Sequence, residues 1–147
     1  MSDVDGISTL ILDPVDAEIV QFDLYVQQKL TNGVNANWET SDSISVWYEG
    51  ANSVVSILNT TGTDIDTAHT GLLGTWTTFT VNLTGSGVGS LKFSLESNAA
   101  TEAIYVDNVT FSGGTTLLAD ADDDDDGWTD VDEVDCGTEP LDPASVP

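Results

Sequence analysis

Strict alternation of apolar and polar residues is the sequence feature that most constrains how this chain can fold. Within residues 18–26, Val20, Phe22 and Leu24 alternate with polar residues such as Gln21 and Asp23. A period of two residues is typical of a half-buried β-strand and argues against an amphipathic helix. With similar Val-, Ile-, Thr- and aromatic-rich segments, the expected strands cover residues 8–12, 18–26, 43–49, 53–58, 75–83, 90–96 and 103–111.

Short clusters of Gly, Asn, Asp and Ser separate these segments and predict turns. The expected turns are at Thr31-Asn32-Gly33, Glu49-Gly50, Thr61-Gly62 and Gly85-Ser86-Gly87. Short strands at regular spacing predict an all-β fold, an antiparallel two-sheet β-sandwich of the jelly-roll type. The sequence predicts this domain over residues 1–113 and a short acidic segment over residues 114–147.

The acidic segment contains a run of the form Asp-Asp-Asp-Asp-Asp-Gly-Trp-Thr-Asp-Val-Asp-Glu, from Asp122 to Glu133. This spacing is typical of a 12-residue calcium loop, in which a glycine at position 6 allows a sharp turn and a final Glu binds through both oxygens. A solvated acidic run is the alternative, but it would need neither that glycine nor that Glu. The expected Ca²⁺ ligands are Asp122, Asp124, Asp126, the carbonyl oxygen of Trp128, Asp130 and Glu133.

Residues 110–118, before the loop, are rich in Thr, Ser and Gly and do not predict the entering helix of an EF-hand. With the following Cys136-Gly137-Thr138-Glu139-Pro140, the loop resembles a bacterial thrombospondin type 3 repeat, although Glu139 replaces the usual Asp. A dockerin is the alternative, but only one copy of the loop is present. The resemblance implies an extracellular calcium-stabilised connector, with one short helix after the loop. It also implies pairing of Cys136 with a neighbouring repeat; a free thiol remains equally compatible.

The segment Ile104-Tyr105-Val106-Asp107-Asn108-Val109 resembles the closing strand of the jelly-roll modules that include many carbohydrate-binding modules. The resemblance implies a second structural calcium held by Asp107, with Glu39, Asp42 and Glu102 as the other candidate ligands. The alternative is that Asp107 accepts hydrogen bonds from the backbone of an adjoining loop. The family also has an additional first strand, which is expected either before this segment or from a neighbouring molecule.

The charge balance limits the partners of the chain. Two Lys and Arg residues stand against 26 Asp and Glu, for a formal net charge of −24. Nucleic acids and anionic membrane surfaces would repel such a chain, whereas divalent cations would be attracted. No segment is long and apolar enough to predict insertion into a membrane.

The residues do not predict an enzyme. His69 is the only histidine, no nucleophile motif accompanies it, and we expect it to be a solvent-exposed loop residue. Glu39 and Asp42 could in principle act as a glycosidase pair. Neighbouring carboxylates arise by chance in so acidic a chain, however, so we expect no catalysis.

Three aromatic residues, Trp47, Trp76 and Tyr25, fall on the outward phase of their strands and are candidates for stacking on a sugar. The alternative is packing beneath a loop, which we expect for Trp38 at the end of the sandwich. The sequence thus predicts a non-catalytic, extracellular or cell-surface calcium-binding module. Its expected role is structural or adhesive, as a connector to adjacent domains or as a fibre subunit that binds copies of itself. A carbohydrate-binding module with glycan partners is the alternative.

Overall fold

The computed structural model describes residues 6–99 and 101–114 of the chain. Antiparallel β-strands make up most of this part, and one helical turn, α1, spans Ile65–Ala68 with a short 3₁₀ turn, η1, at Thr70–Leu72. The strands are β1 (Gly6–Ile11), β2 (Ile19–Val26), β3 (Leu30–Thr31), β4 (Val34–Asn35), β5 (Ser43–Gly50), β6 (Val54–Asn59), β7 (Trp76–Asn82), β8 (Gly89–Ser97) and β9 (Ile104–Ser112). The predicted calcium loop at residues 122–133, the helix expected after it and Cys136 lie outside the described residues.

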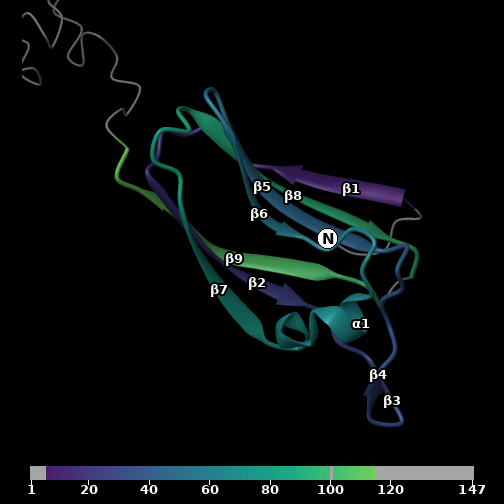
Figure 1. Cartoon of the computed structure of the whole chain (residues 1–147). Coiled ribbons are helices and arrows are strands. Elements are labelled where there is room, and N and C mark those ends of the chain that lie inside the picture. Colours follow the sequence, from purple (N-terminus) through teal and green to yellow (C-terminus); the bar gives the residue numbers. More distant parts are fainter. Residues whose placement is uncertain (1–5, 100, 115–147) are drawn as a thin grey trace, which may run out of the picture. The chain divides into compact units, whose positions relative to one another are not determined.

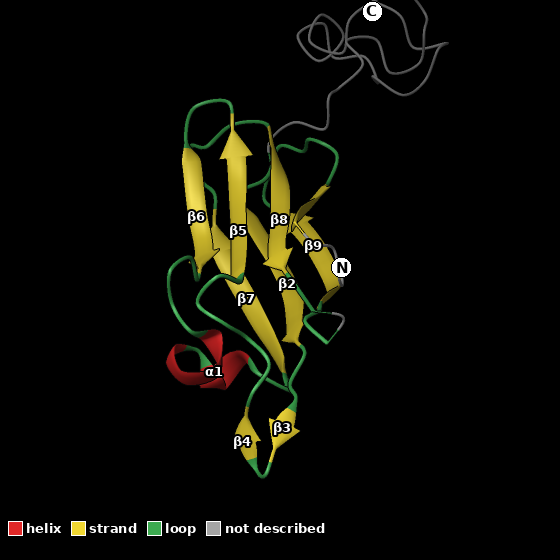
Figure 2. Cartoon of the chain, turned by 90° about the vertical axis from the view of Figure 1, so that its right-hand side faces the viewer, coloured by secondary structure: helices red, strands yellow, loops and turns green. Residues whose placement is uncertain are grey.

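The strands form a four-stranded sheet in the order β1-β8-β5-β6, a three-stranded sheet in the order β7-β2-β9, and a small β3-β4 hairpin. Every pair of neighbouring strands in these sheets is antiparallel. Figure 1 shows the two larger sheets lying one over the other, and Figure 2 shows α1 and the β3-β4 hairpin at one end of them.

The apolar faces of the two larger sheets pack against each other in one hydrophobic core. Phe22 of β2 stacks on Phe79 of β7 with ring centroids 5.1 Å apart, and it meets Phe93 of β8 edge-on at 5.2 Å. The second contact joins the two sheets, because β2 and β8 belong to different ones. The fully buried side chains occupy alternate positions of β2, β5 and β8, and they include Val20, Leu24, Ile44, Val46, Tyr48, Leu91 and Leu95.

All seven strands expected from the sequence are present, with ends that shift by no more than two residues. The mainly antiparallel β fold is therefore confirmed, whereas its classification as a jelly-roll sandwich stays a prediction. The sequence analysis missed the β3-β4 hairpin, although it placed a turn at Asn32-Gly33. It also missed α1, because one turn of helix is too short to show a helical period. Among the described residues, no helix is long and apolar enough to cross a bilayer.

Candidate functional site

Three carboxylates meet at the end of the sheets where β5 begins and β8 ends. Glu39 and Asp42 lie in the loop before β5, and Glu102 lies in the loop between β8 and β9. One carboxylate oxygen of each residue lies within 4.8 Å of one from each of the others. Asp42 and Glu102 are 1% and 0% exposed, while Glu39 is exposed. We call these three residues the carboxylate cluster.

Glu102 is held in place by the loop that precedes it. Its Oε2 accepts hydrogen bonds from the backbone N–H groups of Asn98 and Ala99, both at 2.9 Å. Its Oε1 is equally buried, and it has no hydrogen-bond partner among the described residues. A buried carboxylate oxygen without a partner is costly, because it has lost its water and gained nothing in exchange. A cation bound beside this oxygen would supply the missing partner.

Asp42 connects the two loops of the carboxylate cluster. Its Oδ2 accepts the backbone N–H of Glu39 at 2.5 Å, and its Oδ1 accepts the Nδ2–H of Asn98 at 3.3 Å. Asp42 in turn donates its own N–H to the carbonyl oxygen of Glu39 at 3.1 Å. The loop before β5 is thus folded back on itself, and Asn98, which the sequence analysis did not single out, ties it to the loop after β8.

The electrostatics of the carboxylate cluster are unfavourable for three negative charges. The pKa of Glu39 is raised above its ordinary value, first by the partial loss of water around its carboxyl group and then by the neighbouring carboxylates of Asp42 and Glu102. Lys92, one of two Lys and Arg residues in the chain, forms an ion pair with Glu49 toward the other end of β5. Loss of water and, to a smaller extent, like charges held close together both raise the pKa of a carboxyl group.

Asp66 of α1 supports the loop that carries Glu39. Its Oδ2 accepts the backbone N–H groups of Asn37 and Trp38 at 2.5 Å and 2.9 Å. Asn37 also exchanges two hydrogen bonds with Thr101, through Nδ2–H to the Thr101 carbonyl at 2.6 Å and from the Thr101 hydroxyl at 2.5 Å. Nothing in the sequence singles out Asp66, because its partners lie 28 and 29 positions away and it belongs to no motif.

Trp38 fills this end of the core as expected. Its side chain is 3% exposed, and its Nε1–H donates to the carbonyl oxygen of Gln27 at 2.9 Å. His69 differs from expectation. It is half-buried, and its Nε2 lies 3.1 Å from the hydroxyl of Thr63, so it is not a fully solvent-exposed loop residue.

Asp107 does not join the carboxylate cluster. It lies opposite Asp23 in the pairing of β9 with β2, and its side chain is exposed. Its Oδ1 accepts the backbone N–H of Asn108 at 2.8 Å. The four candidate ligands therefore separate into a cluster of three at the end of the strands and one residue within β9, because the alternation of β9 turns Asp107 away from the core.

The three candidate sugar-binding aromatics also separate. Tyr25 and Trp76 pair across β2 and β7 with ring centroids 5.6 Å apart, and Tyr105 of β9 joins them at 5.8 Å from Tyr25. Trp47 belongs to β5, in the other sheet. Since both sets point away from the shared core, they occupy opposite outer faces and cannot form one site. The sequence analysis missed Tyr105, which has the same outward phase as Tyr25.

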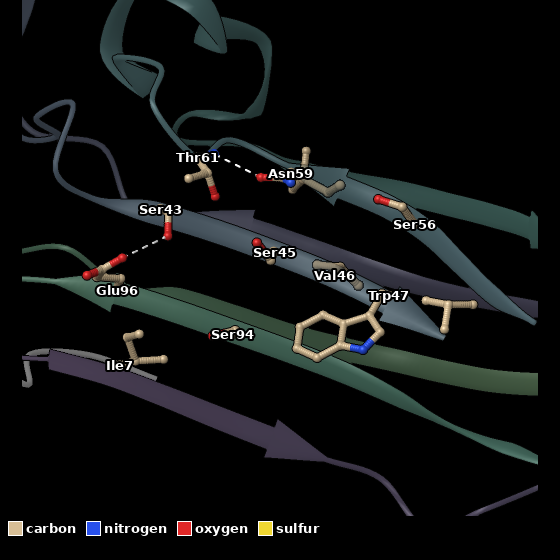
Figure 3. Close-up of a pocket in the computed structure, with 12 residues that line it drawn as sticks. Ile7, Ser43, Ser45, Val46, Trp47, Ser56, Asn59, Thr61, Ser94 and Glu96 are labelled. Carbon is tan, nitrogen blue, oxygen red and sulfur yellow. Dashed lines mark hydrogen bonds between the residues drawn. The ribbon is translucent and has the colours of Figure 1, made fainter. Parts of the chain in front are cut away.

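Trp47 borders a shallow pocket of about 460 Å³ on the outer face of the four-stranded sheet (Figure 3). Strands β5, β6 and β8 contribute serine hydroxyls to it, and Ser43 donates to Glu96 at 3.4 Å. The pocket is lined by Ile7, Ser43, Ser45, Val46, Trp47, Val54, Ser56, Leu58, Asn59, Thr61, Ser94 and Glu96. One aromatic ring beside several hydroxyls can bind a polar ligand that has an apolar face.

Comparison with protein-family models, with curated proteins and with solved structures finds no match to this chain.

Proposed function

We propose that this chain is a non-catalytic calcium-binding module with a β-sandwich of the jelly-roll type, and that it has a structural or adhesive role in an extracellular or cell-surface protein. The observation that carries the proposal is the carboxylate cluster, in which Glu102 is fully buried with one oxygen unpartnered. The predicted loop from Asp122 to Glu133 supplies a second, independent calcium site.

The dimensions of the carboxylate cluster suit a calcium ion. Calcium takes six to eight oxygen ligands at about 2.3–2.6 Å, so two oxygens on opposite sides of one ion are about 5 Å apart. The carboxylate oxygens of the cluster lie within 4.8 Å of one another. Three carboxylates are also the hard, anionic donors that calcium prefers, and waters at the exposed Glu39 would complete the coordination.

A cation in the carboxylate cluster would act as a cross-link. Glu39 and Asp42 belong to one loop and Glu102 to another, so a shared ion would tie the start of β5 to the loop between β8 and β9. It would also remove the mutual repulsion that raises the pKa of Glu39. The proposed role is therefore to stiffen one end of the domain, as the C-terminal loop would stiffen the connection to an adjacent domain or copy.

Calorimetric titration of the metal-free full chain with Ca²⁺ tests the proposal. We expect two classes of site in the wild type. Glu102→Gln should remove one class, since the amide keeps the shape of the side chain but carries no charge. Asp126→Ala should remove the other class and leave the first intact.

Asp107→Asn is the matched control for the same titration, since Asp107 is a carboxylate outside the cluster. We expect this variant to keep both classes of site. Unchanged stoichiometry in Glu102→Gln would reject the cluster as a calcium site. Loss of a site in Asp107→Asn instead would indicate that Asp107 on β9 is a calcium ligand.

Carbohydrate binding is the second candidate function, and the pocket beside Trp47 favours it. A pocket of about 460 Å³ falls in the size range of small-molecule sites, about 300–1,000 Å³. Its lining combines the Trp47 ring with the hydroxyls of Ser45, Ser56 and Ser94, a combination that suits the apolar face and the hydroxyl groups of a sugar.

An array of neutral and charged oligosaccharides tests this second function. We expect binding of a neutral glycan that is lost in Trp47→Ala and retained in Trp76→Ala, which changes the opposite face. Equal binding by wild type and Trp47→Ala would reject the pocket as the glycan site.

A further inference from the structure

The outer face of the three-stranded sheet carries a row of aromatic rings that the core does not use. Tyr25 lies between Trp76 and Tyr105, which face it in the register of β7 and β9. Trp76 and Tyr105 are 53% and 50% exposed. Half-exposed large aromatic side chains on neighbouring strands are unusual on a surface that serves only solubility. We call these three residues the aromatic row.

A row of polar groups lies next to the aromatic row, two residues along each strand. Asp23 accepts a hydrogen bond from the Thr78 hydroxyl at 2.5 Å and one from Asn108 Nδ2–H at 2.7 Å. These bonds hold the carboxylate in place and lower its pKa, so Asp23 is ionised at neutral pH. Two residues of a strand span about 7 Å, which places the charge within reach of any long side chain lying on the rings.

The negative charge of this face is not neutralised from within its own sheet. Asp107 stands directly opposite Asp23 in the strand register, and like charges in that position are destabilising. No lysine or arginine occurs in β7, β2 or β9. Lys92 lies on β8, in the other sheet, where it pairs with Glu49. Lys29, the other lysine of the chain, follows β2 in the connection to β3. The three strands themselves therefore offer no cation to Asp23 and Asp107, and a partner can supply one.

We propose that this face docks an extended, arginine-bearing segment of a partner protein. An arginine guanidinium stacks on aromatic rings and donates bidentate hydrogen bonds to carboxylates. One arginine side chain can therefore contact both the aromatic row and the carboxylates of Asp23 and Asp107. The aromatic row crosses the whole sheet, from the outer strand β7 through β2 to the outer strand β9, so an extended chain can reach it from an edge of the sheet.

The ring geometry favours a cation over a sugar at this face. The Tyr25 ring is inclined by 52° to Trp76 and by 67° to Tyr105, so the three rings do not form a flat platform for stacked pyranoses. A cation needs only one exposed ring face within about 6 Å and a carboxylate beside it. The pocket beside Trp47, on the opposite face, is separate from this surface.

The test is fluorescence anisotropy with a labelled peptide that carries two arginines, added to the full chain in saturating calcium. The same peptide with citrulline in place of arginine is the probe control, because it keeps the shape without the charge. We expect Trp76→Ala and Asp23→Asn each to weaken arginine-peptide binding by about threefold to fivefold. Trp47→Ala and Glu96→Gln, which alter the other face, should match the wild type.

Three results would overturn the proposal. Equal affinity for the arginine and citrulline peptides would exclude recognition of the cation. Equal affinity in wild type and Asp23→Asn would show that the acidic C-terminal run attracts the peptide non-specifically. The Asp23→Asn variant decides this point, because it removes the charge with little change in the shape of the side chain. Binding of a neutral oligosaccharide that is lost in Trp76→Ala would assign the face to sugar.

Discussion

The two ends of the β5–β8 strand pair are closed in opposite ways. At one end, Gly50 lies opposite Gly89 and the backbone packs so closely that a Cβ on either residue would overlap a carbonyl oxygen. The Tyr48 hydroxyl lies 2.8 Å from the carbonyl oxygens of both Val15 and Gly87. These contacts join neutral backbone and hydroxyl groups of the chain directly.

The other end is closed by charges. Among the residues that the structure describes, no ion pair joins a cation to the buried Asp42 or Glu102, and each accepts at least one backbone N–H from its own neighbourhood. Backbone N–H groups offset part of the cost of burying a carboxylate but do not neutralise it. The glycine end is held by contacts within the chain, whereas the carboxylate end is where we propose that an external cation binds.

Gly89→Ala should give the largest effect, because the added methyl would meet the Glu49 carbonyl oxygen and the Gly50 Cα atom, which are backbone atoms that cannot turn aside. We expect the free energy of unfolding to fall by at least as much as the upper end of the range for overpacked cores, which is about 1–3 kcal/mol. Urea unfolding with calcium and with chelator measures it, and the loss should be the same in both. Gly71→Ala, whose Cβ would meet open space, is the control and should change stability by less than about 0.5 kcal/mol.

Glu102→Ala should have the next largest effect, and it should depend on calcium. The substitution removes the acceptor of the Asn98 and Ala99 N–H groups, and with calcium it also removes a proposed ligand. We expect the free energy of unfolding to fall by about 2 kcal/mol in calcium. In chelator the fall should be smaller, because removing a buried charge offsets part of the cost of the lost hydrogen bonds. An equal loss in both conditions would mean that this end, like the glycine end, needs no cation.

Chelation of wild-type protein should loosen one end of the β5–β8 pair only. In hydrogen exchange, the amides of Asn98 and Ala99 should lose about tenfold or more of their protection without calcium, since the carboxylate that accepts them is then repelled by its neighbours. The Ala51 amide, which donates to the Val88 carbonyl at the glycine end, should not change. Equal loss at both ends would contradict the comparison.

The strands and their inward faces could be predicted because both follow from a period of two along the sequence. Phe22 and Phe93 are buried in the phase that the alternation predicts. The carboxylate cluster could be predicted only as a set of candidates, since Glu39 and Glu102 are distant in sequence and nothing local shows that they meet. Family resemblance adds Asp107 to these candidates, but the outward position of its side chain on β9 keeps it apart from them. Asp66 could not have been found, because its partners come from a loop elsewhere in the chain.

The smallest expected effect is a difference in pH dependence between Glu39 and Asp23 in chelated protein. The raised pKa of Glu39 adds stability that is complete below about pH 4.5 and is lost as pH rises through its folded-state pKa. The lowered pKa of Asp23 adds stability that is present above pH 3.8 and is lost as pH falls through its folded-state pKa. Thermal melting of wild type, Glu39→Gln and Asp23→Asn across the acidic range separates the two contributions by their opposite signs.

Calcium should reverse the sign at Glu39 and leave Asp23 unchanged. A bound cation favours the ionised carboxylate, so with calcium the Glu39 contribution should be present at neutral pH and disappear on acidification, as protons displace the metal. Asp23 is held by the hydroxyl of Thr78 and the amide of Asn108 and needs no metal. If the Glu39→Gln difference has the same sign with and without calcium, Glu39 is not a ligand of the proposed cation.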